Sequence, residues 1–321
     1  MHSIFVHRDG VTRQVDAVDP AWLTPQATEI VWANIDGPVE ADRQLLQGVF
    51  HFHELAVEDA LADLHYPKIE SYGHFLYAIL HGIATEREKG GFCTRDVDFF
   101  LGRNFLVTVH TQTSPAIDAE LAVVVRHPNV LGEGSVALLH RIADRMVDGY
   151  LPCIDALEQR LDELEQVVFE DPRANPLQQI LRLKADVASL RRVALPQRDA
   201  VGRLSRREFP EIPEVMAYRF RDVYDHLVRI ADEATFFQDR ITGLVDAYLS
   251  TQSNRMNQVM KVLTLIATIF MPLTVLTGMW GMNVKIPHFP GSEAAQFWWV
   301  TGLMAALTTV MLWWFRRMRW L

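Results

Sequence analysis

The sequence predicts an α+β cytoplasmic domain, then long stalk helices, then a two-helix transmembrane hairpin. Strand-like runs lie in roughly the first 130 residues, helical periodicity follows from about residue 134, and two uncharged apolar runs lie near the end. We therefore expect an α/β domain over residues 1–133, a helical stalk over 134–261 and a transmembrane domain over 262–321. The last of these includes an outer loop and a basic C-terminal tail.

The expected strands of the first domain are runs rich in aromatic and β-branched residues. They cover Glu29–Ile35, Phe75–Ile83 and Val97–Thr111. Between the first two runs, Glu54–Asp63 predicts a helix. Strands and helix together predict a mixed α/β domain.

Amphipathic helices are expected after this domain. One apolar stripe, with steps of three and four residues, consists of Leu157, Leu161, Leu164 and Val168. A second helix is expected from Leu177 to Leu195, ending at Pro196 because proline interrupts the helical hydrogen bonds.

The third helix is the longest, because no proline occurs between Glu214 and Pro272. Its apolar residues keep a heptad-like spacing: Val223, Leu227, Ile230, Ala234, Phe237, Ile241 and Leu244. The pattern continues into the first apolar run, which predicts one helix of about 65–70 residues and ~100 Å. Such a helix cannot bury its stripe alone, so it needs partner helices from its own chain or from sister subunits.

Two apolar runs, Val262–Trp280 and Phe297–Phe315, each extend over 19 residues without a charge. Each would reach ~28 Å as a helix, close to the thickness of a bilayer core. A buried helix of a soluble protein is the alternative interpretation. Two consecutive runs with tryptophans at their ends favour membrane spans, since tryptophan concentrates at the membrane interface.

Basic residues predict the orientation of this hairpin. Arg316, Arg317 and Arg319 follow the second run, while Arg255 and Lys261 precede the first. The positive-inside rule then places both termini in the cytoplasm of a bacterial-type inner (plasma) membrane, with the linker outside.

Charge and motifs exclude several functions. The segment from Thr251 onwards holds six basic residues and one acidic residue, so the part before it is strongly acidic. An acidic surface argues against a nucleic-acid partner. The two cysteines form neither a disulfide framework nor a Cys-x-x-Cys metal site. The sequence has no HExxH motif, phosphate-binding glycine loop or Ser/His/Asp set, so we expect neither an enzyme nor an organic cofactor.

One face of the first span combines small, polar and apolar residues at helical spacing. Its members are Asn257, Met260, Leu263, Ala267, Met271, Thr274 and Gly278, and the face ends near Asn283. This pattern is also found on surfaces where helices pack together. Two spans cannot enclose an aqueous pore, so transport would require a pore-forming homo-oligomer. Neutral oxygens suit Mg²⁺, which keeps much of its water, whereas Zn²⁺ prefers Cys and His.

The segment Met256–Asn283 (MNQVMKVLTLIATIFMPLTVLTGMWGMN) closely resembles the CorA family of metal-ion transporters. The family hallmark is a Gly-Met-Asn triplet at the outer end of the first span, here Gly281, Met282 and Asn283. Further blocks of the chain resemble the family as well: His53–Leu61, Pro67–Tyr72, Phe99–His110 and Arg219–His226.

The resemblance implies a homopentamer with a cytoplasmic funnel, which transports Mg²⁺, Co²⁺ and Ni²⁺. The triplet would form the selectivity filter, with a hydrated ion at Asn283. Pore-lining positions would be Asn257, Met260, Leu263, Met271, Thr274 and Gly278, with Leu263 and Met271 as hydrophobic constrictions. Asp222 and Glu86 would bind a regulatory metal ion inside the cell.

The outer loop departs from the magnesium-transporting members, which carry acidic residues just after the triplet. Here Lys285 and His288 occur, with Glu293 as the one acidic residue. This loop looks more like the zinc-transporting ZntB branch, so Mg²⁺ and Zn²⁺ both stay open, as do uptake, efflux and proton coupling. A hypothesis of another class is a membrane-anchored, metal-sensing or structural oligomer that does not conduct.

Overall fold

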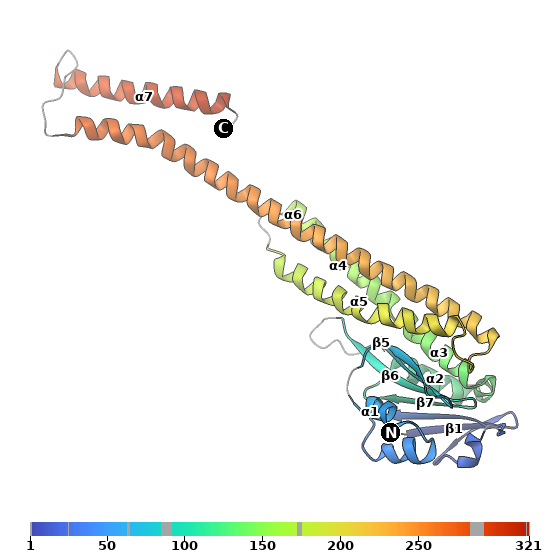
Figure 1. Ribbon diagram of the computed structural model, residues 1–321. Coiled ribbons are helices and arrows are strands. Elements are labelled where there is room, and N and C mark those ends of the chain that lie inside the picture. Colours follow the sequence, from blue (N-terminus) through green and yellow to red (C-terminus); the bar gives the residue numbers. More distant parts are fainter. Residues whose placement is uncertain are drawn as a thin grey trace. The chain divides into compact units, whose positions relative to one another are not determined.

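The computed structural model describes residues 2–24, 26–62, 65–84, 92–171, 175–282, 292–318 and 320 (Figure 1). The chain forms two compact units, Met1–Val245 and Asp246–Leu321. The first unit holds the sheet and the soluble helices, and the second holds the apolar helices at the end of the chain. Together these elements confirm the predicted fold class for a single chain.

The sheet of the first unit has seven strands in the order β2-β1-β3-β7-β6-β5-β4. Neighbouring strands are antiparallel except for the central pair β3 and β7, which are parallel. The strands are β1 (His2–Arg8), β2 (Val11–Val15), β3 (Ile30–Asp36), β4 (Lys68–Ser71), β5 (Leu76–Ile83), β6 (Thr94–Leu101) and β7 (Phe105–His110).

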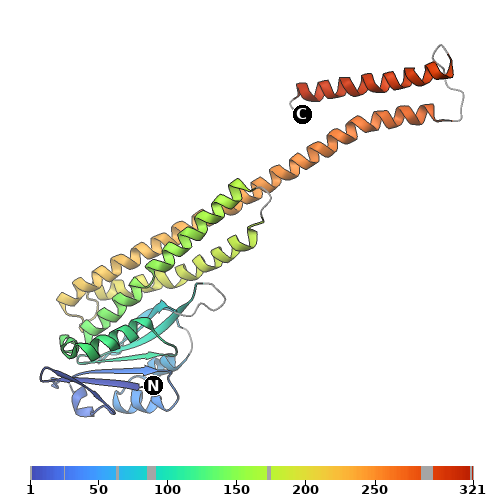
Figure 2. The same cartoon turned by 180° about the vertical axis from the view of Figure 1, so that it is seen from behind.

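Helices cover both faces of this sheet (Figure 2). Helix α3 (Ser135–Asp148) packs on one face across the central strands and pairs with α2 (Pro115–Arg126). The other face is covered by the π-helical turn η2 (Gln44–Val49) and by α1 (Glu54–Leu61), which share a buried cluster with it. That cluster is rich in aromatic rings, with Phe52 stacked on Phe100 at 4.2 Å between ring centroids.

The predicted strands are confirmed in type but not in number. β3 and β5 match the expected runs, whereas the run Val97–Thr111 is two strands joined by a tight turn, in which Gly102 N–H donates to the carbonyl of Phe105 at 2.9 Å. The structure adds β1, β2 and β4, and α1 confirms the helix expected from Glu54.

Three long helices follow: α4 (Leu151–Glu170), α5 (Leu177–Ser205) and α6 (Glu214–Trp280). The predicted stripe on α4 is buried, which confirms that this face packs against its neighbours. The 67 residues of α6 also confirm one continuous helix, which passes through Pro272.

The predicted end of α5 at Pro196 is wrong, because the helix continues to Ser205. A proline removes the hydrogen bond to the carbonyl four residues earlier, here that of Arg192. Arg192 is exposed, so water can satisfy that carbonyl. The next residue, Gln197, is buried and anchors the helix to the sheet.

At the end of β5, the side chain of Gln197 makes the backbone hydrogen bonds that a neighbouring strand would otherwise make. Strand β4 pairs with β5 only as far as Ile79, which lies opposite Lys68, the first residue of β4, so the backbone groups of His81 lie beyond the β4 pairing. The Gln197 side-chain oxygen accepts from His81 N–H at 2.7 Å, and its nitrogen donates to the His81 carbonyl at 3.2 Å. Tyr150 Oη donates to the same carbonyl at 3.0 Å.

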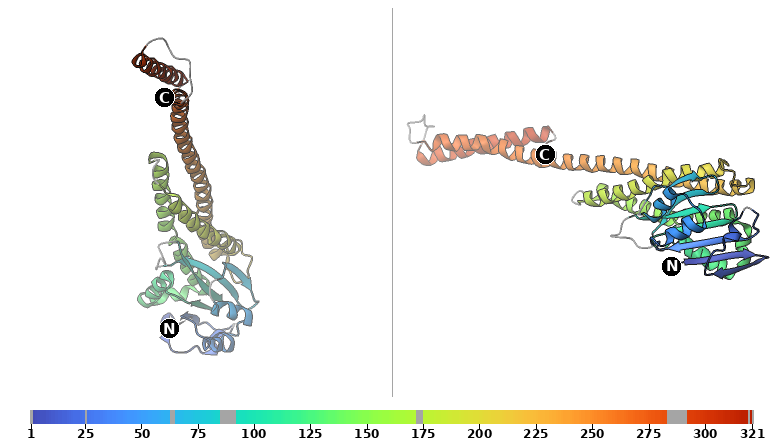
Figure 3. Two further views of the ribbon diagram at one scale, coloured as in Figure 1. Left: turned by 90° about the vertical axis from the view of Figure 1, so that its left-hand side faces the viewer. Right: turned by 60° about the horizontal axis from the view of Figure 1, so that its bottom comes forward.

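The second unit contains the end of α6 and the antiparallel helix α7 (Glu293–Arg317), which lies alongside it (Figure 3). Both helices are long and apolar enough to cross a membrane, and their apolar windows are almost entirely exposed to the surroundings. Since water would not tolerate so large an apolar surface, these helices belong in a bilayer.

Candidate functional site

One face of the α6 span lies against α7. The half-buried or buried residues recur, singly or in pairs, about every four residues: Lys261, Leu265, Thr268, Ile269, Pro272, Leu273, Leu276 and Trp280. Ile269 is the most enclosed of them, with 9% of its surface exposed. This row of residues defines the α7-facing side of the span.

The predicted polar stripe lies on the other side of the same helix. All of its members are exposed: Asn257, Met260, Leu263, Ala267, Met271, Thr274 and Gly278. Met271, for example, has 69% of its surface exposed. At about 100° of rotation per residue, the centre of this row lies ~150° from the α7-facing row. The face that sequence reasoning selected is therefore the one that α7 leaves uncovered.

The uncovered face presents hydrogen-bond acceptors and open space. The Thr274 hydroxyl donates to the carbonyl of Phe270 at 2.9 Å, which leaves its oxygen lone pairs directed away from the backbone. Gly278 has no neighbouring atom within 4 Å of where a Cβ would lie. Such a face can accept hydrogen bonds from the water molecules around a hydrated cation.

The Gly-Met-Asn triplet begins where α6 ends. Gly281 N–H donates to the Thr277 carbonyl at 2.9 Å, and a Cβ at Gly281 would lie 3.2 Å from that oxygen. Met282 follows and is exposed. The rest of the predicted filter and outer loop, Asn283, Lys285 and His288, lies outside the described residues, while Glu293 is the first residue of α7.

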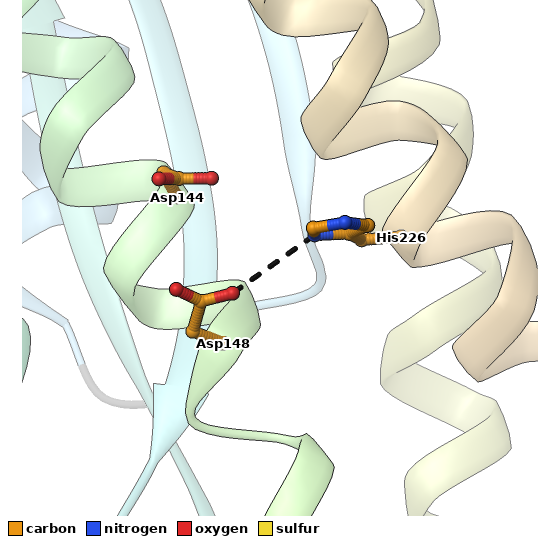
Figure 4. A group of neighbouring side chains, drawn as sticks. All are labelled: Asp144, Asp148 and His226. Atoms are coloured by element: carbon orange, nitrogen blue, oxygen red, sulfur yellow. Dashed lines mark ion pairs between the residues drawn. The ribbon is translucent and has the colours of Figure 1, made fainter.

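A second candidate site lies in the first unit, between α3 and α6 (Figure 4). One ligand atom each of Asp144, Asp148 and His226 lies within 4.8 Å of the others. The closest ion pair joins His226 Nδ1 to Asp148 Oδ1 at 3.9 Å. Carboxylate oxygens and an imidazole nitrogen are ligands for divalent cations, so these three residues could hold a metal ion.

The electrostatics of this group favour a cation. Burial raises the pKa of Asp144, and the neighbouring charge of Asp148 raises it further. Asp222 lies one helical turn before His226 on α6, is exposed, and also raises the pKa of Asp144 through its charge. The predicted regulatory residue Asp222 therefore lies close to this group, whereas its expected partner Glu86 lies outside the described residues.

Sequence reasoning did not select Asp144 or Asp148. Their spacing of four residues on α3 places both on one side of the helix, which is the local signal that was present. His226 occurs in one of the family-like blocks, but its contact with α3 depends on the tertiary fold.

An ion-pair network fixes α3, the helix that carries these two aspartates. Glu120 on α2 is 0% exposed and accepts from Arg141 Nε at 2.6 Å and from Arg145 Nε at 3.3 Å. Arg141 also donates to the exposed Glu133 at 2.9 Å. Because both arginines belong to α3, the buried carboxylate positions that helix against α2.

Comparisons with known proteins agree with these observations. A family model described as "CorA-like Mg2+ transporter protein" matches residues 27–317. The "Putative metal ion transporter YfjQ" of Bacillus subtilis is 33% identical over 309 residues, which cover 96% of this chain and 92% of that protein. The "Cobalt/magnesium transport protein CorA" of Thermotoga maritima is 31% identical over 325 residues, covering 100% and 91%.

The fold is also found in a solved structure. The complete CorA magnesium transporter of Methanocaldococcus jannaschii superposes with a TM-score of 0.84 at 22% sequence identity. The match covers 100% of this chain and 99% of that one. At this identity the match bears on the fold, and it includes both the α/β sheet and the apolar helices.

Proposed function

The chain belongs to the CorA-like Mg²⁺ transporter family of membrane divalent-cation transporters, and from this premise we propose that it conducts Mg²⁺ through a homopentameric pore. Co²⁺ and Ni²⁺ would act as surrogate ions. Both chain termini and the first unit would lie in the cytoplasm of a bacterial-type inner membrane, because the arginines of the tail follow the second span directly.

The observation that carries this proposal is the division of α6 into two faces. One face packs on α7, and the opposite face holds Thr274, Gly278 and the exposed Met271. If copies of the chain turn this uncovered face inward, their α6 helices line a central path and their α7 helices lie outside. Leu263 and Met271 would then form apolar constrictions that close the path by dewetting.

Mg²⁺ is favoured over Zn²⁺ by the ligands on this face. Between Val262 and Trp280 the span holds neither Cys nor His, the ligands that Zn²⁺ prefers. The threonine hydroxyl and backbone oxygens of the span, with the side-chain amide of Asn257 before it, suit an ion that passes with much of its hydration shell. The relative from Thermotoga maritima, whose name specifies cobalt and magnesium transport, supports the same ion class. Zn²⁺ is the second candidate, because Lys285 and His288 give the outer loop a zinc-transporter-like composition.

Regulation would come from the group on α3 and α6. We infer that Asp144, Asp148 and His226 bind an intracellular divalent cation, with Asp222 adding negative charge nearby. Since α6 carries both His226 and the pore-lining face in one unbroken helix, a bound ion can bias the position of that helix. Glu86 would contribute from a neighbouring copy, as the family resemblance implies.

Flux into proteoliposomes tests the proposal. Mg²⁺ and Zn²⁺ uptake are measured side by side with ion-sensitive dyes, with and without a proton gradient. We expect Mg²⁺ flux without a proton gradient and loss of ion selection in Asn283→Ala. Zn²⁺ flux that requires the gradient would favour a proton-coupled zinc transporter instead. No flux of either ion under any gradient would contradict the proposal and favour a non-conducting metal sensor.

A further inference from the structure

The face of α7 that points away from α6 carries a hollow with basic residues at one end. Residues of α7 that pack toward α6 recur at three- and four-residue steps: Val300, Met304, Leu307, Met311 and Phe315. Thr309, Leu312, Trp313 and Arg316 line a hollow of about 670 Å³. At about 100° per residue, this second row lies ~150° around α7 from the first. The hollow therefore opens away from α6.

The lining of the hollow changes from apolar to cationic along the helix. Leu312 and Trp313 supply exposed apolar surface, with 62% of Trp313 exposed, and Arg316 follows one turn later. The guanidinium carbon of Arg317 lies 5.8 Å from the centre of the Trp313 ring, within the range of a cation–π contact. Two arginines and an indole thus meet at the end of one helix.

A third cation lies at the same end of this unit. Lys261 Nζ on α6 lies 6.0 Å from the ring centre of Trp320, and Trp320 stacks on Phe315 of α7 at 5.9 Å. The C-terminus of a helix carries roughly half a negative charge. The charges of Arg316, Arg317 and Lys261 exceed this several-fold, so the field at this end of the helix attracts anions.

The position of these residues along the membrane span restricts what can bind. The uncharged run of α7 ends at Phe315, so Arg316 and Arg317 lie where hydrocarbon meets water. Thr309 lies about 10 Å deeper along the helix axis. A ligand that fills the hollow needs an anionic group at the arginines and an apolar body beside Leu312.

We propose that this hollow binds an anionic phospholipid, with its phosphate group at Arg316 and Arg317 and an acyl chain along Leu312 and Thr309. Basic pockets at the cytoplasmic ends of membrane helices bind anionic headgroups by the same electrostatics. A free phosphate ion would leave the apolar part unfilled, and a zwitterionic lipid offers no net charge to the arginines. The site depends on membrane insertion and not on ion conduction.

Lipid titration of the full-length chain in neutral detergent tests this site. Phosphatidylglycerol and phosphatidylcholine with identical acyl chains are added separately, glycerol phosphate is a third ligand, and bound molecules are counted by native mass spectrometry. We expect the wild type to bind phosphatidylglycerol more tightly than either other ligand. The double variant Arg316→Gln/Arg317→Gln should bind it about 30-fold more weakly, from roughly fivefold per arginine, with unchanged binding of phosphatidylcholine.

Two variants serve as controls. Arg126→Gln removes one positive charge from an exposed position at the end of α2 and should leave lipid binding unchanged. Arg316→Lys/Arg317→Lys keeps the charge that membrane insertion needs and should retain the preference for phosphatidylglycerol.

Three outcomes would overturn the lipid site. In the first, the wild type binds phosphatidylglycerol and phosphatidylcholine equally. In the second, the double glutamine variant keeps the full preference for phosphatidylglycerol. In the third, Trp313→Ala changes the mass of the oligomer without changing the lipid preference. The last outcome would assign this face to a second copy of the chain. Ion flux measured in parallel in pure phosphatidylcholine vesicles separates the two proposals, since flux without lipid preference overturns the lipid site alone.

Discussion

The buried carboxylate of Glu120 allows a quantitative test of how α3 is held in place. The variant Glu120→Gln keeps the shape of the side chain but removes the charge that Arg141 and Arg145 share. Breaking a buried ion pair costs about 3–5 kcal/mol, because the remaining charge loses its partner without regaining water. Arg141 keeps Glu133, and Arg145 is 42% exposed, so we expect a loss near the lower limit, ~3 kcal/mol.

The control uses the same arginine. Glu133 also binds Arg141 but is 52% exposed, so Glu133→Gln should cost between about 0 and 1 kcal/mol. For a unit of this size, ~3 kcal/mol lowers the Tm by about 6–12 °C. Thermal unfolding and urea pulse proteolysis of the detergent-solubilised chain measure both variants. If Glu120→Gln costs no more than Glu133→Gln, the buried pair does not hold α3.

Three further predictions concern the pore, the candidate metal site of Asp144, Asp148 and His226, and a buried acid. Thr274→Val should lower Mg²⁺ flux about tenfold, because each subunit loses one hydrogen-bond acceptor. Thr301 on α7 donates to its own helix in the same way, and Thr301→Val should leave the flux unchanged. Equal losses of flux in the two variants would show that Thr274 does not line the pore. Saturating Mg²⁺ should raise the wild-type Tm by about 5–10 °C, and Asp144→Asn should abolish most of this rise in a thermal-shift assay; a full rise in the variant would exclude Asp144 as a ligand. Burial raises the pKa of Asp98, so the ionised carboxylate opposes folding at neutral pH and Asp98→Asn should raise the Tm there. This difference in Tm between the variant and the wild type should disappear as the pH falls below about 3.9, the pKa of an aspartate in the unfolded chain. A difference in Tm that does not depend on pH would refute the raised pKa of Asp98.

The long helix α6 was predictable because its apolar residues keep one period from Val223 to Leu244 without a break signal. The turn between β6 and β7 was not. Gly102 and Asn104 are weak turn signals inside a run of aromatic and β-branched residues, so the pattern predicts one strand where the structure has two. Strand β4, with four residues, is too short to show alternation.

The continuation of α5 through Pro196 depends on tertiary contacts that no local pattern reports. The proline costs one helical hydrogen bond, and the burial of Gln197 against His81 offsets that loss. The candidate metal site could not be predicted from a local pattern either, because Asp148 and His226 lie on separate helices that only folding brings together. The uncovered face of α6, by contrast, followed from spacing alone, since helix geometry fixes which residues share a face.

The side-chain amide of Gln197 reduces the risk that chains aggregate during assembly. Unpaired backbone N–H and carbonyl groups at the edge of a sheet are templates for pairing with another chain. At His81 both of these groups are already occupied within the same chain, and the adjoining strand β4 is short. In newly made copies that gather at high local density on a membrane, the backbone groups of His81 are therefore not available for strand pairing between chains.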